Sequence, residues 1–360
     1  MSRTQLDDRS GSRPVASGGR SMRAVVQARY GAAPEDVLRL AEIDRPIADD
    51  GEVLVQVHAS SVDRGTWHIM SGLPYPIRLA GFGLRRPAYA NPGRSLAGTV
   101  EAVGARVTGW RPGDQVFGIG QATFAEYARV RADRLAVKPA RLSFGEAAAA
   151  PVSGLTALQA VRDHGRVRAG DRVLVIGAAG GVGTFAVQIA KAAGAEVTGV
   201  CRTSKVDLVR SLGADHVLDH TRQDVVDGRH RYDVILDIGG NRRLSRLRRA
   251  LTPHGRLVIV GGETDGRLLG GSSRQLRATA LSPFTSQRLG TFIAKEDARD
   301  LRALGDLMAV GAVAPVIDRT HPLADAAAAI RHLLDGQTRG KIVVSVHPGD
   351  AQAPNSGRPE

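Results

Sequence analysis

A stretch of about thirty residues limits the fold more than any other part of this chain. Residues 172–177, RVLVIG, form a continuous apolar run that is typical of a strand buried on both faces. A turn of small residues follows at 178–183, and then an apolar-striped segment that ends at Gly194. A second apolar run, AEVTGVC, occupies 195–201. A buried strand, a glycine turn, a helix and another buried strand predict a parallel sheet covered by helices.

The turn AAGGVG has the spacing of the G-x-G-x-x-G dinucleotide-binding turn, with Ala178 at the first position. Gly180 would let the backbone approach a pyrophosphate closely, and Gly183 would let the helix pack closely on the strand. The first N–H groups of that helix suit a phosphate. Because the turn lies between a buried strand and a helix, as the motif requires, we expect a bound dinucleotide.

The residues after the second strand predict which dinucleotide binds. Folds specific for NAD place an acid there, where it accepts from the ribose 2′-hydroxyl. Here the strand is followed by Arg202, Ser204 and Lys205, and no acid occurs before Asp207. Two cations and nearby hydroxyls suit a 2′-phosphate, so NADPH is the predicted cofactor.

The rest of the chain divides into two kinds of segment. From Met22 to about residue 142, short strands such as MRAVVQA, DVLRLAEI and EVLVQVHAS alternate with turns, which indicates an antiparallel, barrel-like β domain. From 143 to 287, apolar strands alternate with helices, and Ser143 and Glu146 have the spacing of a capping box.

The C-terminal part resembles the first domain again. A helix over about 295–311 and the strand GKIVVSV follow the helix-rich region, so residues 288–346 are predicted to complete the β domain. The predicted organisation is therefore a catalytic β domain (22–142 and 288–346), a doubly wound α/β domain (143–287) and two disordered polar tails (1–21 and 347–360).

Composition narrows the range of functions. The net charge is +13, but the basic residues are spread along the chain and aromatic residues are only 4%, so nucleic acid is an unlikely partner. No apolar run is long enough for a transmembrane helix. The single cysteine, Cys201, excludes an internal disulfide and fits a reducing compartment. We expect a cytoplasmic monomer or homodimer that binds a small molecule.

Several motifs together resemble the medium-chain dehydrogenase/reductase superfamily, and within it the zinc-independent quinone oxidoreductase branch. The motifs are AAGGVG after a buried strand, SLGADHVLDH, DVILDIGG and TRGKIVVSV, and the resemblance covers about 22–346. It implies a GroES-like catalytic domain, a Rossmann domain and a cleft between them. The positions that it implies for cofactor binding are Ala179, Gly180, Gly181, Val182, Gly183, Ser204, Lys205, Gly239, Gly261 and Lys341.

Two departures from the branch concern these sites. The branch usually has a tyrosine near the 2′-phosphate where this chain has His220, whose imidazole is able to replace the hydroxyl. It also usually carries Ser-Val-Asn at the substrate pocket, where this chain has Ser-Val-Asp with Asp63. An ionised Asp63 would disfavour an anionic enolate, whereas a protonated one would be a proton donor, and both readings stay open.

The resemblance also bears on metal and substrate. A zinc-dependent relative needs a cysteine where Asp63 stands and a Gly-His-Glu motif where this chain has Gly93-Arg94-Ser95. Arginine does not ligate zinc, so no metal site is predicted. Without a Lewis acid, quinones and α,β-unsaturated carbonyls are easier acceptors than alcohols, because hydride adds at carbon and the charge spreads over an enolate.

The predicted function is therefore NADPH-dependent reduction of a quinone or enone, with Trp67 and Tyr75 in the substrate pocket and residues 78–93 as its edge. One alternative is an enoyl-thioester reductase, in which arginines would bind a phosphorylated carrier. Another is a nucleotide-binding redox sensor with weak RNA binding and little turnover.

Overall fold

The structure is a computed structural model that describes residues 21–347 apart from 228–229, 240–241 and 262–271. The tails that we predicted to be disordered lie outside the described residues, except at their inner ends. Ser21, which we assigned to the first tail, begins strand β1. None of the helices in the described part of the chain is long and apolar enough to cross a membrane.

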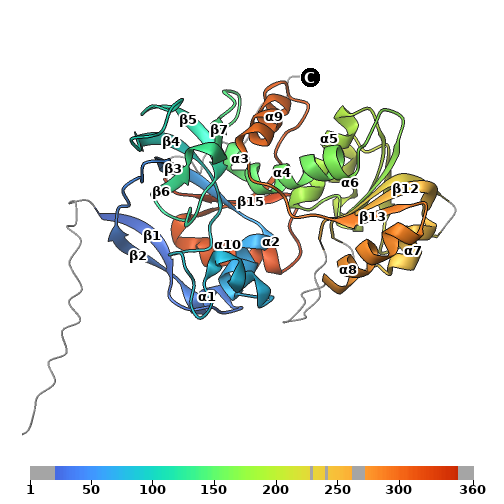
Figure 1. The fold of residues 1–360 in the computed structure, drawn as a ribbon, viewed down its shortest axis with the longest axis horizontal. Coiled ribbons are helices and arrows are strands. Elements are labelled where there is room, and N and C mark those ends of the chain that lie inside the picture. The colour runs from blue at the N-terminus through green and yellow to red at the C-terminus, as the bar shows by residue number, and fades with distance from the viewer. Residues whose placement is uncertain (1–20, 228–229, 240–241, 262–271, 348–360) are drawn as a thin grey trace, which may run out of the picture.

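A six-stranded parallel sheet forms one half of the molecule, on the right in Figure 1. Its order is β10-β9-β8-β11-β12-β13. The chain runs from β8 outward through β9 to β10 and then returns to place β11 on the other side of β8. This reversal puts the topological switch point, where ligands bind in such sheets, between the carboxyl ends of β8 and β11. The strands are β8 (Arg172–Ile176), β9 (Glu196–Cys201), β10 (His216–Asp219), β11 (Tyr232–Asp237), β12 (Leu251–Ile259) and β13 (Arg288–Thr291).

A seven-stranded sheet forms the other half, and strands from both ends of the chain join it. Its order is β14-β15-β3-β4-β5-β7, with β6 paired to β3, and only the β14–β15 pair is parallel. The strands are β3 (Glu52–Val62), β4 (Ser95–Val103), β5 (Gln115–Ile119), β6 (Tyr127–Arg131), β7 (Leu135–Val137), β14 (Ile317–Pro322) and β15 (Lys341–Ser345). A separate antiparallel pair consists of β1 (Ser21–Gln27) and β2 (Leu38–Asp44).

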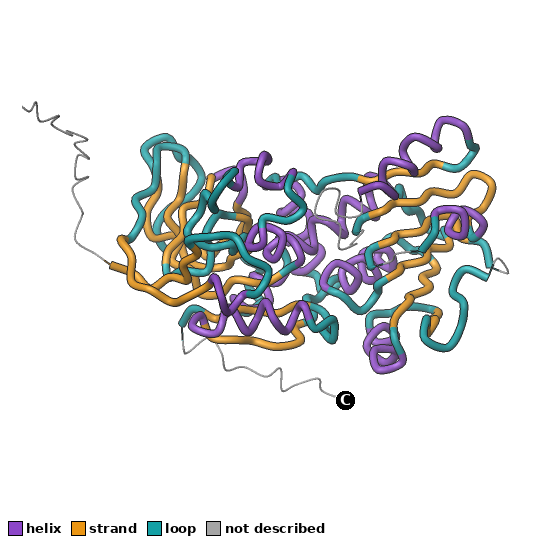
Figure 2. The backbone as a smooth tube through the Cα atoms, turned by 90° about the horizontal axis from the view of Figure 1, so that it is seen from below, coloured by secondary structure: helices purple, strands orange, loops and turns teal. Residues whose placement is uncertain are grey.

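Helices lie between and around the sheets, as the tube view in Figure 2 shows. The α-helices are α1 (Pro34–Val37), α2 (Arg64–Ser71), α3 (Phe144–Ala149), α4 (Pro151–Gln159), α5 (Gly181–Ala192), α6 (Val206–Ser211), α7 (Leu244–Arg249), α8 (Ser272–Leu281), α9 (Ala298–Ala309) and α10 (Ala326–Leu334). One apolar cluster includes Phe117 from β5, Leu155 from α4 and Phe185 from α5, so the two halves share a core.

Local capping signals place several helix starts. The predicted capping box is confirmed: the Ser143 hydroxyl accepts from the Glu146 N–H, and the Glu146 carboxylate accepts from the Ser143 N–H. The helix that we predicted from residue 295 begins at Ala298 instead, because Asp297 caps it by accepting from the Asp300 N–H at 2.9 Å.

Two expected boundaries were wrong. We expected a strand from Asp36, but Pro34 at the first helical turn begins the short helix α1, and the strand starts only at Leu38. We also ended the α/β domain at residue 287. Strand β13, however, pairs in parallel with β12, so that the sheet extends to Thr291. A four-residue edge strand carries too little periodicity for the sequence to reveal its partner.

Candidate functional site

The glycine turn at the carboxyl end of β8 is shaped by contacts that exclude side chains. A Cβ at Gly183 would lie 2.1 Å from the Gly177 carbonyl oxygen, so only glycine lets α5 pack this closely on the strand. A Cβ at Gly180 would meet nothing nearer than the same oxygen at 3.5 Å. The space beside Gly180 is therefore a cradle that a side chain would fill, at the start of α5 and its free N–H groups. This geometry fits a pyrophosphate.

The neighbouring strand end at β11 carries a buried ion pair that our sequence reasoning missed. The Asp237 carboxylate has no exposed surface and lies 2.6 Å from the Arg274 guanidinium of α8. Arg274 also donates to the carbonyls of Arg242 and Gly261, at 3.1 and 3.2 Å. It therefore holds together the ends of β11 and β12 that carry Gly239 and Gly261, the positions implied for the cofactor.

The predicted phosphate ligands lie at a short 3₁₀ turn after β9. Arg202 and Ser204 are exposed. The Lys205 ammonium donates to the Thr338 carbonyl at 2.7 Å, and its burial lowers its pKa. His220 is exposed, and its backbone N–H donates to the Cys201 carbonyl at 3.1 Å, which places it beside the end of β9.

An acidic residue that we did not predict, Asp219, also lies near the end of β9. Asp219 ends β10, and its carboxylate accepts from the Thr203 hydroxyl at 2.5 Å and from the Thr221 hydroxyl at 2.7 Å. These hydrogen bonds lower its pKa to about 2. We found no acid along β9, but the parallel pairing of β9 and β10 brings one from the next strand.

Asp63 and Lys341 meet where the two halves of the molecule join. Asp63 caps α2, because one carboxylate oxygen accepts from the Thr66 N–H at 3.1 Å. The Lys341 side chain is buried, and its ammonium donates to the Val62 carbonyl at 2.8 Å. Burial lowers the pKa of Lys341, and the Asp63 charge opposes that shift. Lys341 thus reaches the predicted substrate side and not only the cofactor side.

The two predicted pocket residues differ in their surroundings. Trp67 is half-buried against the core of the seven-stranded sheet and donates to the Ala32 carbonyl at 3.3 Å. Tyr75 is exposed, and the Arg78 guanidinium lies 5.0 Å from its ring centre. No described contact joins either residue to Asp63, so their place in a pocket stays a prediction.

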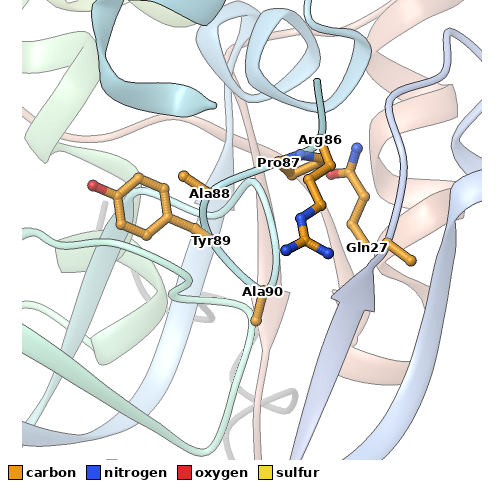
Figure 3. Close-up of a pocket in the computed structure, with 7 residues that line it drawn as sticks. Gln27, Arg86, Pro87, Ala88, Tyr89 and Ala90 are labelled. Atoms are coloured by element: carbon orange, nitrogen blue, oxygen red, sulfur yellow. The ribbon is translucent and has the colours of Figure 1, made fainter. Parts of the chain in front are cut away.

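Residues 86–90, from the segment that we predicted as a pocket edge, line a hollow of about 570 Å³ at the end of β1 (Figure 3). Neither Trp67 nor Tyr75 lines it, so the predicted edge of the substrate pocket stays a prediction. Gln27 lines it from β1 and donates to the Met70 carbonyl of α2 at 2.6 Å. Arg86 is exposed, and Figure 3 shows its side chain on the same side as Gln27, whereas the Tyr89 ring points away. The hollow therefore combines a cation with a buried amide.

Arg94, which stands at a zinc-ligand position of metal-dependent relatives, makes structural hydrogen bonds instead. The Arg94 guanidinium makes two hydrogen bonds to the Glu296 carboxylate, at 2.7 and 2.8 Å, and donates to the Gly120 carbonyl. Within the described residues, no group of three or more His, Cys, Asp or Glu side chains is placed to hold a metal ion. Independence from zinc remains a prediction.

Comparisons with known proteins agree with this architecture. A family model of the alcohol dehydrogenase GroES-like domain matches residues 49–140, and one described as zinc-binding dehydrogenase matches residues 212–344. The structure resembles the quinone oxidoreductase of Coxiella burnetii, with a TM-score of 0.79 at 27% identity, over 91% of this chain and all of that one. The fold and the glycine turn thus define a medium-chain dehydrogenase/reductase.

Sequence relatives identify the branch. The quinone oxidoreductase of Sus scrofa is 31% identical over 92% of this chain and 99% of its own length. The Escherichia coli quinone oxidoreductase, solved with NADPH, has a TM-score of 0.75 at 25% identity, over 90% of this chain and all of that one. The CurK enoyl reductase has a TM-score of 0.77 at 25% identity, over 89% and 99%. The chain belongs to the quinone oxidoreductase-like medium-chain dehydrogenases/reductases and is an oxidoreductase.

Proposed function

We propose that this protein is an NADPH-dependent, zinc-independent oxidoreductase that transfers hydride to a quinone or an α,β-unsaturated carbonyl. The observation that carries the cofactor choice is the pair of cations, Arg202 and Lys205, at the end of β9 where an NAD-binding fold has its acid. Asp219 lies close by, but its hydrogen bonds to Thr203 and Thr221 occupy it.

NADPH would supply the hydride, and this chain would position it. The cradle beside Gly180 and the first N–H groups of α5 would hold the pyrophosphate. Arg202, Ser204 and Lys205 would hold the 2′-phosphate, and Arg274 would keep the ends of β11 and β12 in place.

The residues at the zinc-ligand positions of metal-dependent relatives support the proposed substrate class. Because Arg94 is committed to Glu296 and is no zinc ligand, nothing at this position would polarise a simple alcohol. A conjugated acceptor needs less help, since the charge that develops on hydride addition is delocalised. The buried Lys341 ammonium offsets the unfavourable charge of Asp63 beside such an acceptor.

Cofactor affinity tests the proposal. NADPH should bind at least about tenfold more tightly than NADH, which corresponds to roughly 1.4 kcal/mol. Lys205→Ala should reduce this ratio, whereas Lys191→Ala, which removes a lysine near the end of α5 that pairs with Asp215, should not. Isothermal titration measures both, and equal affinity for the two cofactors in the unmutated protein would refute NADPH preference.

Turnover tests the reaction. Loss of NADPH absorbance should follow addition of quinones or enones and should persist after exhaustive chelation. One zinc ion per chain in elemental analysis, lost together with activity, would contradict the zinc-independent assignment.

A second candidate, reduction of an enoyl thioester, is favoured by Arg86 at the hollow. A phosphorylated carrier would meet this cation at the hollow, and Gln27, which also lines the hollow, donates to the Met70 carbonyl of α2, the helix that Asp63 caps. Crotonyl-CoA and its N-acetylcysteamine thioester share the enoyl group, but only the former carries phosphates. Arg86→Gln should raise KM about tenfold for crotonyl-CoA alone, and Arg85→Gln, an exposed neighbour outside the lining, is the matched control.

A further inference from the structure

The joint between the two halves of the molecule is built around one lysine. Strand β15 pairs antiparallel with β3, with Ile342 opposite Val62, so Lys341 begins β15 beside the end of β3. On the other side, Gly340 bridges Gly180 of the glycine turn, and its N–H donates to the Ala179 carbonyl at 2.9 Å. The backbone therefore places Lys341 between the cofactor turn and the residue that follows β3, which is Asp63.

The side chain of Lys341 spans this joint. Its Cδ atom would lie 3.0 Å from a Cβ built on Gly181, so the aliphatic part runs directly against the glycine turn. Its ammonium ends at the Val62 carbonyl, 2.8 Å away, and only 2% of the residue is exposed. The same side chain thus fixes the separation between the turn and the end of β3.

The two carboxylate oxygens of Asp63 have different surroundings. Oδ1 accepts from the Thr66 N–H and completes the capping box of α2. Oδ2 is buried and has no hydrogen-bond partner among the described residues. A buried acceptor without a partner is costly, by about 1–3 kcal/mol, and more for a charged group. A ligand that donates a hydrogen bond would remove this cost.

We propose that Asp63 Oδ2 accepts a hydrogen bond from the nicotinamide half of the bound cofactor, and that Lys341 is the positioning residue that holds Asp63 at the required distance from the glycine turn. The inference rests on the proposed function, because it assumes a nicotinamide dinucleotide. The donors of that half are the ribose hydroxyls and the carboxamide N–H. Asp63 is then a cofactor-binding residue and not the proton donor.

Binding measurements separate this role from a structural one. Asp63→Ser keeps a good helix cap but removes the second acceptor and the charge beside Lys341, so α2 should stay capped, and the melting temperature measures the loss of stability that comes from the charge. NADPH affinity should fall about tenfold in this variant. Adenosine 2′,5′-bisphosphate, which lacks the nicotinamide half, should bind equally to both proteins. An equal loss for both ligands, or no loss for NADPH, would overturn the proposal.

Two further arms complete the test. The 3-acetylpyridine analogue of NADPH lacks the carboxamide N–H. If the parent binds this analogue tenfold more weakly than NADPH and Asp63→Ser binds the two equally, the donor is the carboxamide. If the ratio of the two affinities is the same in the parent and in Asp63→Ser, the donor is a ribose hydroxyl. Lys341→Met keeps the packing under Gly181 without the ammonium. Its loss of NADPH affinity should not add to that of Asp63→Ser in the double variant, and additive losses would refute the positioning role.

Failure of the proposed function would look different. If the unmutated protein bound neither NADPH nor adenosine 2′,5′-bisphosphate, the cofactor assignment itself would be wrong. If it bound both and Asp63→Ser changed nothing, only the present inference would fail.

Discussion

The glycine turn after β8 and the Asp63–Lys341 joint lie on either side of one backbone bridge, yet they are built in different ways. The turn is made of backbone: Gly183 approaches the Gly177 carbonyl more closely than any side chain would allow, and Gly180 leaves a cradle. The joint is made of side chains, a buried ammonium and a helix-capping carboxylate. Few residue types fit at the glycine turn, because its shape depends on close backbone contacts. At the Asp63–Lys341 joint, a substitution changes the chemistry of the site, because side chains form it.

The largest effect should come from the buried ion pair at the end of β11. Arg274→Met removes the guanidinium that lies 2.6 Å from the buried Asp237 carboxylate, which should lower the free energy of unfolding by about 3–5 kcal/mol. Chemical denaturation measures it. Arg277→Met, an exposed arginine of the same helix, is the control and should have little effect. A loss below 1 kcal/mol for Arg274→Met would mean that this half relies on backbone alone.

Two alanine substitutions test the backbone side directly. Gly183→Ala forces a Cβ against the Gly177 carbonyl and should cost about 1–3 kcal/mol of stability. Gly180→Ala has room for its Cβ, so it should fold normally but bind NADPH about tenfold more weakly, because the methyl group fills the cradle. Thermal unfolding and titration give both values. Unchanged NADPH affinity in a folded Gly180→Ala protein would place the pyrophosphate elsewhere.

A partly exposed ion pair beside the start of β4 should matter less. Arg94→Gln removes the two hydrogen bonds to Glu296 and should cost about 1–2 kcal/mol, because Arg134, 2.9 Å from Glu296, still pairs with that carboxylate. Arg134→Gln should cost less, since its side chain is more exposed. Equal losses of unfolding free energy for Arg94→Gln and Arg134→Gln would show that Arg94 stabilises the protein no more than Arg134 does.

The smallest expected effect is a pH dependence at the end of β10. Hydrogen bonds hold the pKa of Asp219 at about 2, below its ordinary value of 3.8, so folding favours the ionised form. The stability that Asp219 contributes is present above about pH 4 and is lost as pH falls toward 2. Asp219→Asn should therefore show a shallower loss of stability between pH 4 and 2 than the parent. Identical slopes would contradict this.

The sequence predicted the glycine turn and the capping of α3 well because each depends on residues a few positions apart. It predicted the start of β2 less well, because Pro34 and its neighbours favour a helical turn where the alternation of apolar residues suggested a strand. Asp63 illustrates a deeper limit. Its departure from the family pattern was visible, but its capping of α2 and the different surroundings of its two oxygens required the structure.

The sequence by itself determined the βαβ crossover, the cradle for a dinucleotide and the family, since glycine spacing and apolar runs act locally. Only the tertiary structure decided which side chains meet. Lys341 reaches the carbonyl of Val62, 279 residues away, Asp219 joins Thr203 from the next strand, and Arg274 comes from α8 to the end of β11. Strand pairing and helix packing bring such residues together. No local pattern predicts these pairs, because the partners lie far apart in the sequence.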